Sequence, residues 1–275
     1  MELEILRAIQ SIHCGFLDVF FQAITIMAEQ YVMILALLAV YWLYDKELGE
    51  YVAYSLMTAM AFTNGVKNIF KLPRPIGEEG IRTLHAKTAT GYSFPSGHSQ
   101  ISSSLAWSFA AWLKKRWIRI AAIVFTLLVA FSRLYLGVHY PKDVLVGLIL
   151  GVGFSYLCLW LYKKIKNRVA LYFVTSAVML VFFLFEPSKD FIKSCGLLLG
   201  FAVAMLIDHK FLRYDIKVRF PIRLLRLALG LVAAGIVYLP MKLLLPDMLV
   251  FAFLRYFTLS VMVLGVYPIT FRWIK

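Results

Sequence analysis

The stretch YSFPSGHSQISSSLAWSFAAWL, residues 92–113, sets a short polar motif directly before a run of small and apolar residues. Pro, Ser, Gly and His in succession are typical of a loop that gives way to the start of a helix. The run from residue 98 to 113 predicts a helix in a membrane. The motif is a weak signal when isolated, and it needs partners elsewhere in the chain.

The composition of the whole chain excludes an ordinary water-soluble protein. Of its 275 residues, 61% are hydrophobic and only 16% are charged, and the mean hydropathy is +0.78. Because a bilayer offers no water to the backbone, a segment that crosses it satisfies its own hydrogen bonds as a helix. We therefore expect an all-α fold, a polytopic transmembrane helical bundle.

Nine apolar segments predict the spans of this bundle. They lie at about 31–44, 50–70, 98–113, 118–133, 143–162, 168–185, 191–208, 223–244 and 248–271. Residues 3–28 mix apolar positions with charged ones, which suits an amphipathic or shallow segment. The sequence leaves open whether this first segment crosses the membrane.

The positive charge of the chain, formally +14, is gathered in short linkers between the apolar segments. This placement indicates membrane orientation rather than nucleic-acid binding. The basic linkers 114–119, 163–168 and 209–223 fall on one side of the layout and are expected to be cytoplasmic. The loop at about 71–97 then faces outward, which predicts a cell-membrane protein with an extracytoplasmic site.

Three polar clusters stand at the ends of these spans, where ionisable residues are costly and indicate a site. They are KNIFKLPRP at residues 67–75, PSGH at residues 95–98 and SRLYLGVHYPKD at residues 132–143. On the predicted layout all three reach the same outer boundary of the membrane, so they can form one pocket. Fixed cations and the backbone N–H groups that open a helix suit a phosphate group.

The two histidines of these clusters supply a mechanism for attack on phosphorus. His139 can act as a neutral nucleophile if a carboxylate holds its other ring nitrogen, and Asp143 lies four residues later. His98 can protonate the leaving oxygen and then activate water. The three cysteines have no paired spacing, so neither a disulfide framework nor a metal-binding motif is supported. We expect no cofactor.

Together the clusters resemble the type 2 phosphatidic acid phosphatase superfamily, the lipid phosphate phosphatases, whose signature reads K-x6-R-P, P-S-G-H and S-R-x5-H-x3-D. The matching positions are Lys67, Arg74, Pro75, Pro95, Ser96, Gly97, His98, Ser132, Arg133, His139 and Asp143. The resemblance implies a metal-independent hydrolase that acts on a lipid phosphate or diphosphate at the outer face through a phosphohistidine. It implies that His139 is the nucleophile, that His98 acts as acid and base, and that Asp143 orients His139. It also implies that phosphate is bound by Lys67, Arg74, Ser96, Gly97 and Arg133.

The resemblance covers residues 1–165, which it implies are the six-helix phosphatase core, and leaves 166–275 as a C-terminal transmembrane extension of about four helices. The extension is expected either to form a wall beside a lateral lipid entrance or to mediate self-association into a homo-oligomer. The same site suits a polyprenyl diphosphate phosphatase or a lipid phosphotransferase, and the catalytic residues do not separate these functions. A lipid transporter or flippase is the alternative from another class, but its polar residues would be expected near the membrane midplane.

Several other residues receive a structural interpretation. Lys71 is expected to extend to the membrane interface, and Arg82 and His85 to lie on a solvated loop. Gly147 and Gly151 are expected to mark close helix packing. The identity of the lipid is not determined by the sequence.

Overall fold

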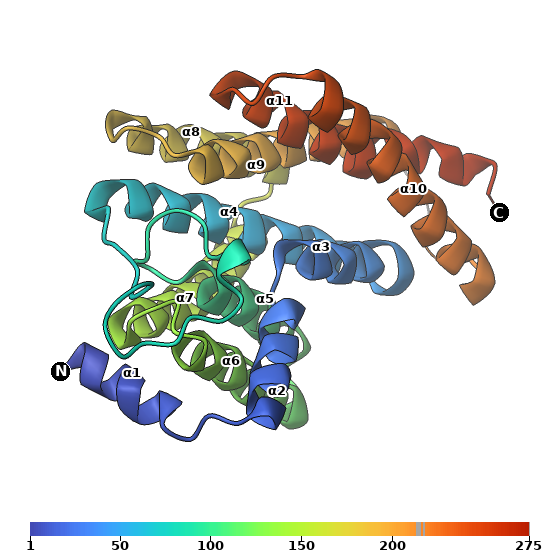
Figure 1. The fold of residues 1–275 in the computed structure, drawn as a ribbon. Helices are drawn as coiled ribbons and strands as arrows, with labels where there is room; N and C mark the ends of the chain where they lie inside the picture. The colour runs from blue at the N-terminus through green and yellow to red at the C-terminus, as the bar shows by residue number, and fades with distance from the viewer. Residues whose placement is uncertain (213–215, 217, 275) are drawn as a thin grey trace.

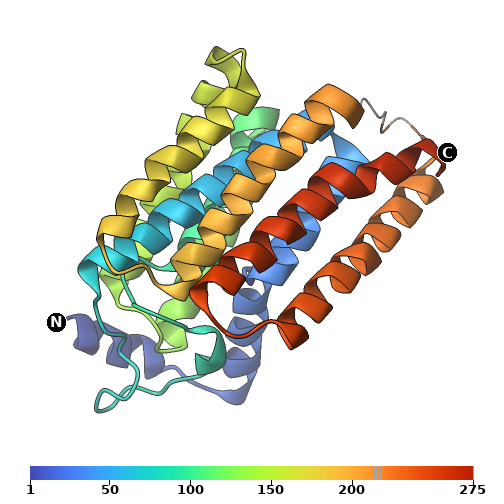
Figure 2. The ribbon, with the colours of Figure 1, turned by 90° about the horizontal axis from the view of Figure 1, so that it is seen from above.

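The structure, a computed structural model, describes residues 1–212, 216 and 218–274, and within them it is helical and contains no strand. The prediction of an all-α bundle is confirmed. From α3 onward, successive long helices run in alternating directions between two ends of the molecule (Figures 1 and 2). The N-terminus and the loop at residues 71–96 lie at one end, here called the loop end, and the C-terminus lies at the opposite end (Figure 2).

The predicted spans correspond to helices, several of which continue into π- or 3-10-helical turns. In chain order the elements are α1 (Glu2–Gln10), α2 (Gly15–Met27), α3 (Gln30–Ala39) with η1 (Val40–Tyr44), α4 (Lys46–Phe70), η2 (Ala86–Thr88), α5 (Gly97–Leu113), α6 (Arg116–Tyr135), α7 (Pro141–Lys164), α8 (Arg168–Met179) with η3 (Leu180–Leu184), α9 (Lys189–Ile207) with η4 (Asp208–Leu212), α10 (Phe220–Leu244), and α11 (Leu249–Ser260) with η5 (Val261–Val266) and η6 (Tyr267–Arg272). Side-chain caps explain where some of them begin. The Asp45 carboxylate accepts the Leu48 N–H at 2.9 Å at the start of α4, for example.

Residues 3–28 form two short helices rather than one straight span. α1 and α2 are bent by 119° at the break between them. The side chain of Gln10, at the end of α1, donates to the carbonyl oxygens of Arg82 at 2.7 Å and Tyr135 at 2.9 Å. These bonds tie α1 to the loop end of the bundle.

Within the described residues, five helices are both long and apolar enough to cross a bilayer by themselves: α6, α7, α9 with η4, α10, and α11 with its continuation. The bent pair α1–α2 would add a sixth if it were one broken span. The other predicted spans are shorter or more polar. α4 is 25 residues long but carries Glu47, Glu50 and Lys67, and other helices bury most of its length. A helix enclosed by protein does not need an apolar surface toward lipid.

α4 is the central helix of the bundle. It lies between α5 and α7 on one side and α8 and α9 on the other (Figure 1). α5 and α7 approach each other closely through glycines of α7. A Cβ atom added at Gly147 would lie 2.6 Å from the Ser96 carbonyl oxygen, and one at Gly151 would lie 2.5 Å from Ser103 Cβ. The expectation that these glycines mark close packing is confirmed.

The C-terminal helices pack on the core through α8 and α9, and polar contacts reinforce this at the opposite end. Glu50 of α4 is buried there, and its Oε1 accepts from the Tyr172 hydroxyl of α8 at 2.6 Å. His209 Nε2, in η4, lies 3.2 Å from the same oxygen. A buried carboxylate needs such partners, so these contacts join the two parts of the chain. The division at residues 165 and 166 stays a prediction.

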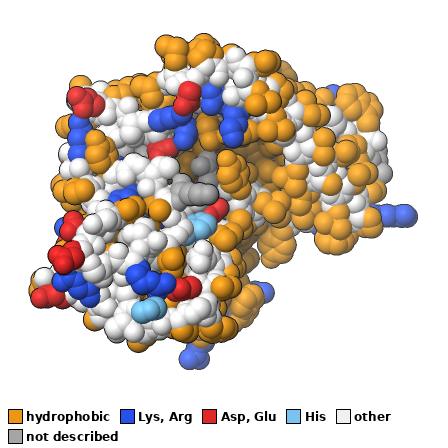
Figure 3. All heavy atoms as spheres, in the orientation of Figure 1, with side chains coloured by type: hydrophobic (Ala, Val, Ile, Leu, Met, Phe, Trp, Pro, Cys, Tyr) orange, Lys and Arg blue, Asp and Glu red, His pale blue; other side chains and the backbone are white. Residues whose placement is uncertain are grey.

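Apolar side chains cover much of the outer helical surface. In Figure 3 charged side chains gather over the loop end, whereas hydrophobic ones cover most of the right-hand side of the molecule. Leu243 of α10 is 80% exposed and Ile236 is 68% exposed. Contiguous apolar surface of this kind faces lipid in a membrane protein, and the chain is an integral membrane protein.

The basic linkers lie together at the opposite end of the molecule. α5 and α7 both begin at the loop end, so the linkers 114–119 and 163–168 that follow them lie at the other. The third linker, 209–223, follows α9 in the same way. Its residues 213–215 and 217 lie outside the described residues.

Candidate active site

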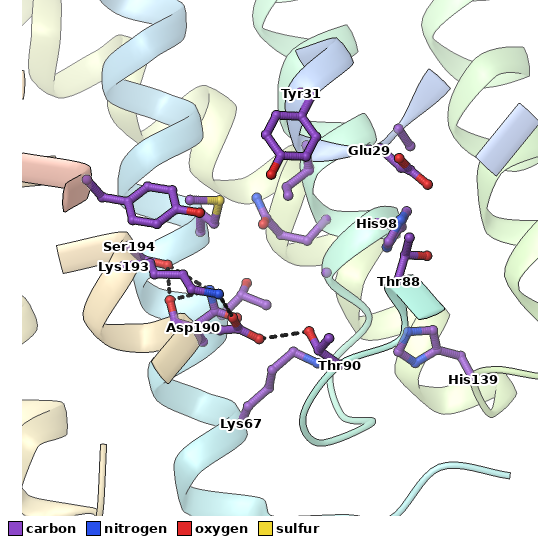
Figure 4. Close-up of a pocket in the computed structure, with 18 of the residues that line it drawn as sticks. Glu29, Tyr31, Lys67, Thr88, Thr90, His98, His139, Asp190, Lys193 and Ser194 are labelled. Carbon is purple, nitrogen blue, oxygen red and sulfur yellow. Dashed lines mark hydrogen bonds and ion pairs between the residues drawn. The ribbon is translucent and has the colours of Figure 1, made fainter. Parts of the chain in front are cut away.

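The three polar clusters of the sequence meet at the loop end of the bundle. A cavity of about 350 Å³ lies there between α4, α5 and the loop at residues 71–96. The predicted residues that line it are Lys67, Arg74, Gly97, His98 and His139. Ser96, Arg133 and Asp143 are not part of this lining and are fully buried. Figure 4 shows Lys67, His98 and His139 around the cavity.

Backbone carbonyls of the loop hold two of the predicted phosphate-binding cations. Lys67 Nζ, near the end of α4, donates to the carbonyl oxygen of Tyr92 at 2.6 Å. Arg74 donates through Nε to Gly91 O at 3.0 Å and through Nη2 to Thr90 O at 2.7 Å. Burial lowers the pKa of Arg74 to about 10, so the guanidinium is still charged at neutral pH. Neutral carbonyl partners fix the direction of these cations without cancelling their charge.

His139 is held between a guanidinium and a carboxylate. Its Nε2 lies 2.9 Å from Arg74 Nη1, while its Nδ1 lies 3.3 Å from Ser93 Oγ and 3.4 Å from Asp143 Oδ2. The Ser93 hydroxyl also donates to Asp143 Oδ2. Burial, together with the nearby Arg74 and Arg133, lowers the pKa of His139 well below its usual value. The ring is therefore neutral at neutral pH, and a neutral ring keeps one nitrogen lone pair free to act as a nucleophile.

The turn between α6 and α7 gives His139 its position. Gly137 has a φ of +67°, and a Cβ atom there would lie 2.2 Å from a carbonyl oxygen of the long loop, so only glycine fits. Asp143 Oδ2 accepts the backbone N–H of Tyr140 at 2.9 Å, which fixes the start of α7. The same carboxylate thus orders both the helix start and the histidine.

The N-terminus of α5 opens onto the cavity. The Ser96 side chain caps this helix by accepting the Ser99 N–H at 3.4 Å, and the Ser96 N–H donates to the Asp143 carbonyl oxygen at 2.9 Å. Ser96 therefore fixes the place where the helix begins, and Gly97 and His98 of the first turn line the cavity. N–H groups of a first turn lack intrahelical acceptors and suit an anion. His98 Nε2 is buried and has no hydrogen-bond partner among the described residues.

Arg133 lies in the last turn of α6. It is completely buried, and its Nη1 donates to Thr25 Oγ1 of α2 at 2.6 Å. Within the described part of the chain, its Nε and Nη2 have no acceptor. Unused donors on a buried guanidinium are costly, and an anion would satisfy them. Because Arg133 does not line the cavity, its contact with phosphate stays a prediction.

One wall of the cavity consists of residues that sequence reasoning missed. Asp190, Lys193 and Ser194 of α9 line it together with Tyr256 of α11. In Figure 4 the three α9 residues lie across the cavity from His98 and His139. Their spacing of three and four positions places them on one helical face, and this spacing was the only signal in the sequence.

Asp190 connects this wall to the loop that holds the cations. Its Oδ2 accepts from Thr90 Oγ1 at 2.9 Å, and its Oδ1 pairs with Lys193 Nζ at 2.8 Å. The Thr90 carbonyl oxygen in turn accepts from Arg74 Nη2. A side chain of the C-terminal part therefore helps to fix the loop segment that directs Arg74. Ser93, which bridges His139 and Asp143, was also missed because it lies outside the signature.

The residues given a structural interpretation lie outside the cavity. Lys71 pairs with Glu186 at the surface. Arg82 and His85 are not simply solvated, because each has an acidic partner. Arg82 Nη2 lies 2.7 Å from Asp18 Oδ2, and His85 Nε2 lies 2.7 Å from Glu29 Oε1. These pairs tie the long loop to the N-terminal helices.

The arrangement as a whole suits chemistry on an anion. It combines cations held by neutral partners, a helix N-terminus, a neutral histidine and a second histidine with an unused nitrogen. Across the described ranges, no three or more His, Cys, Asp or Glu side chains gather as a metal site requires. Donors directed at one point in a buried site are what a phosphoryl-transfer transition state needs.

Comparisons with known proteins agree with this chemistry. The PAP2 superfamily model matches residues 49–167, and the model of the transmembrane extension of PAP2 superfamily phosphatases matches residues 192–275. Lipid A 4'-phosphatase of Bacteroides thetaiotaomicron is 29% identical over 182 residues, which are 62% of this chain and 78% of that protein. Undecaprenyl-diphosphatase BcrC of Bacillus subtilis is 31% identical over 167 residues, 57% of this chain and 82% of that protein. The crystal structure of Aquifex aeolicus LpxE aligns with a TM-score of 0.52 and 27% identity, covering 57% of this chain and 94% of that one.

Proposed function

This chain is a membrane lipid phosphatase of the PAP2 superfamily, and we propose that it releases phosphate from a lipid through a phosphohistidine on His139. The observation that carries the proposal is the geometry of His139. Its Nε2 lies 2.9 Å from Arg74, at the cavity, while its Nδ1 is held by Ser93 and Asp143. A phosphate bound by Arg74 would replace this contact, and Nε2 would then face phosphorus.

The reaction runs in two steps. In the first, His139 Nε2 forms a bond to phosphorus as the bond from phosphorus to the lipid oxygen breaks, and His98, as an imidazolium beside the bound phosphate anion, gives one proton to that oxygen and becomes neutral. In the second, His98 takes a proton from water, the water oxygen bonds to phosphorus, and the bond to His139 breaks. Inorganic phosphate leaves, and both histidines return to their starting forms.

The cations stabilise the transition state of each step. Lys67 and Arg74 line the cavity, and charge on the equatorial oxygens develops where these groups are already directed. The first-turn N–H groups of α5, at Gly97 and His98, add further donors. Arg133, with its unused donors, is the third cation of the predicted set.

The site faces the extracytoplasmic side in this proposal. The basic linkers lie at the end of the bundle opposite the cavity, and positively charged linkers are retained in the cytoplasm. An apolar groove supports a lipid substrate. It is lined by α3, α4, α5 and α9 and shares Met60 and Ile101 with the cavity. A lipid chain in this groove would bring its headgroup to the histidines.

Two related activities fit the same residues. A diphosphate substrate is favoured by the likeness to the undecaprenyl-diphosphatase of Bacillus subtilis, and it changes only the leaving group. Transfer of the phosphoryl group to an acceptor other than water would differ only in the second step. The transporter alternative loses support, because the cavity with its three polar motifs lies at one end of the bundle rather than at its centre.

The test is phosphate release by the purified protein from a panel of lipid phosphates and diphosphates in EDTA. We expect release by the wild type and a loss of about 10⁴-fold or more in His139→Ala, since a covalent nucleophile has no substitute. His13→Ala is the matched control, because this histidine is exposed and its Nδ1 lies 3.0 Å from the Gln10 carbonyl oxygen, outside the cavity lining. Full activity of His139→Ala would contradict the assignment of the nucleophile.

A further inference from the structure

The cavity is larger than its phosphate-binding side requires. A volume of about 350 Å³ falls at the small end of the range of cavities that hold whole small molecules, whereas a phosphate group has five heavy atoms. His98 and His139 lie on one side of it, across from Asp190, Lys193 and Ser194 (Figure 4), and Arg74 Nη1 is 2.9 Å from His139 Nε2. The other side must therefore receive the group to which the phosphate is attached.

The wall on this other side carries mixed hydrogen-bonding groups in place of free cations. Lys193 Nζ is paired with Asp190 Oδ1 at 2.8 Å, so the two charges offset each other. Asn64 Nδ2 donates to Ser194 Oγ at 2.7 Å, and Ser194 Oγ donates to the Asp190 carbonyl oxygen at 2.7 Å. Among the described side chains of this wall, no cation is left over for a second phosphate, which would require one.

Gln100 of α5 indicates the chemistry of the group that would occupy this other side of the cavity. It is fully buried and lines the cavity, yet neither its Nε2 nor its Oε1 has a hydrogen-bond partner in the described part of the chain. A buried amide left without partners is costly. It offers one donor group and one acceptor side by side, and a hydroxyl group, which both donates and accepts, matches both.

Tyrosine rings complete the wall. Tyr256 of α11 is almost fully buried, and its ring centroid lies 6.0 Å from Lys193 Nζ. Tyr31 of α3 also lines the cavity and is 67% exposed, and Figure 4 shows its ring at the edge of the cavity. Such rings combine an apolar face with a polar tip, which suits the carbon skeleton and hydroxyls of a polyol or a sugar.

From these observations we propose that the wall formed by Gln100, Asn64, Ser194, the Asp190–Lys193 pair and Tyr256 is a headgroup subsite for a neutral, hydroxyl-bearing polyol or sugar. This inference rests on the proposed function, because it takes the phosphate on that headgroup to be the one removed. The C-terminal extension contributes Asp190, Lys193, Ser194 and Tyr256, so its helices take part in substrate choice. A polyprenyl diphosphate, in which an apolar chain directly follows the phosphates, would leave the wall without partners.

The subsite can be tested by comparing two monophosphate lipids with the same acyl chains. One carries its phosphate on a sugar or glycerol headgroup with free hydroxyls, and the other is phosphatidate, which has none. We expect the wild type to prefer the hydroxylated lipid in kcat/KM by at least about tenfold, since sites built around a hydroxyl discriminate strongly against its absence. Gln100→Met and Ser194→Ala should each reduce this ratio at least about threefold while changing phosphatidate hydrolysis less. Ser108→Ala, buried on α5 outside the cavity lining, is the control and should keep the ratio.

Binding to the inactive His139→Ala variant separates this inference from the proposed function. We expect that variant to bind the hydroxylated lipid more tightly than phosphatidate, and the preference to fall when Gln100→Met is added. Equal binding of the two lipids, or tighter binding of a polyprenyl diphosphate, would overturn the subsite whatever the activity. If the preference in binding holds while the wild type releases no phosphate, the proposed function fails and the subsite stands.

Discussion

The two parts of the chain bring polar residues to the cavity in different ways. In residues 46–164 the groups expected to act on phosphate stand in three compact motifs at helix ends and in loops, where Arg74 and His139 are held by several neighbouring groups, and Asn64 and Gln100 line the cavity outside these motifs. In residues 168–272 the polar residues that line the cavity are single residues on the inner faces of α9 and α11. Groups that act on phosphorus need fixed positions, and the loops and caps that fix them leave motifs in the sequence. Groups that contact a headgroup need only a shared helical face.

The largest expected effect tests the motif-bearing side. Arg74→Ala should lower kcat/KM for phosphatidate by about 10³-fold, because a directed charge on the transition state is lost. Arg74→Lys should recover only part of the loss. A lysine ammonium cannot make both the paired hydrogen bonds of a guanidinium to phosphate and the contact with His139. Lys193→Met on the other wall should cost less than about tenfold. Comparable losses of kcat/KM in Arg74→Ala and Lys193→Met would show that the two sides of the cavity do not differ in this way.

Ser93→Ala examines a residue that no motif contains. Its hydroxyl connects His139 Nδ1 and Asp143 Oδ2, and a hydrogen bond to a charged group is worth about 1.5–3 kcal/mol. We expect kcat to fall by about 10-fold to 100-fold with little change in KM. The measurement is a set of initial rates on phosphatidate in mixed micelles. An unchanged kcat would show that Asp143 orients the ring without the serine.

Asp190→Ala and Thr90→Val test whether the extension supports the phosphate side. Both changes remove the bond between Asp190 Oδ2 and Thr90 Oγ1, so the loop that directs Arg74 is less restrained. We expect each single variant to lose about tenfold in kcat/KM, and the double variant to lose little more, because residues in contact are not additive. Asp247→Ala is the control, since that carboxylate is exposed and pairs with Lys189. Fully additive losses would mean that the two residues act separately.

The smallest expected effect concerns the opposite end of the bundle. Tyr172→Phe removes the hydroxyl that donates to the buried Glu50 at 2.6 Å, so we expect the protein to lose about 1–2 kcal/mol of stability with kcat/KM unchanged. Thermal unfolding in detergent with parallel activity assays would show it. A large loss of activity without a lower Tm would indicate that this end communicates with the cavity.

The fold followed from the sequence because apolar length and linker charge are local properties. The predicted spans correspond to helices, and Gly147 and Gly151 mark close packing as expected. The polar character of α4 is explained only by the structure, because its burial depends on which helices surround it. The same is true of residues 3–28, whose break into α1 and α2 depends on contacts such as those of Gln10.

The candidate site was predictable only as far as its motifs extend. Lys67, Arg74, Gly97, His98 and His139 line the cavity, and the signature had named all of them. Ser93 and Asp190 could not be found in this way, because each acts through a partner distant in the sequence. The headgroup wall was hidden for the same reason, since its residues come from α4, α5, α9 and α11.

The central claim is that His139 carries the phosphoryl group during turnover. The wild type would be mixed rapidly with a lipid whose phosphate is labelled with ³²P and then denatured in alkali, where a phosphohistidine survives. The account predicts label on the peptide that contains His139 and none in the His139→Ala variant. Turnover by the wild type without bound label, or label that persists in His139→Ala, would contradict it.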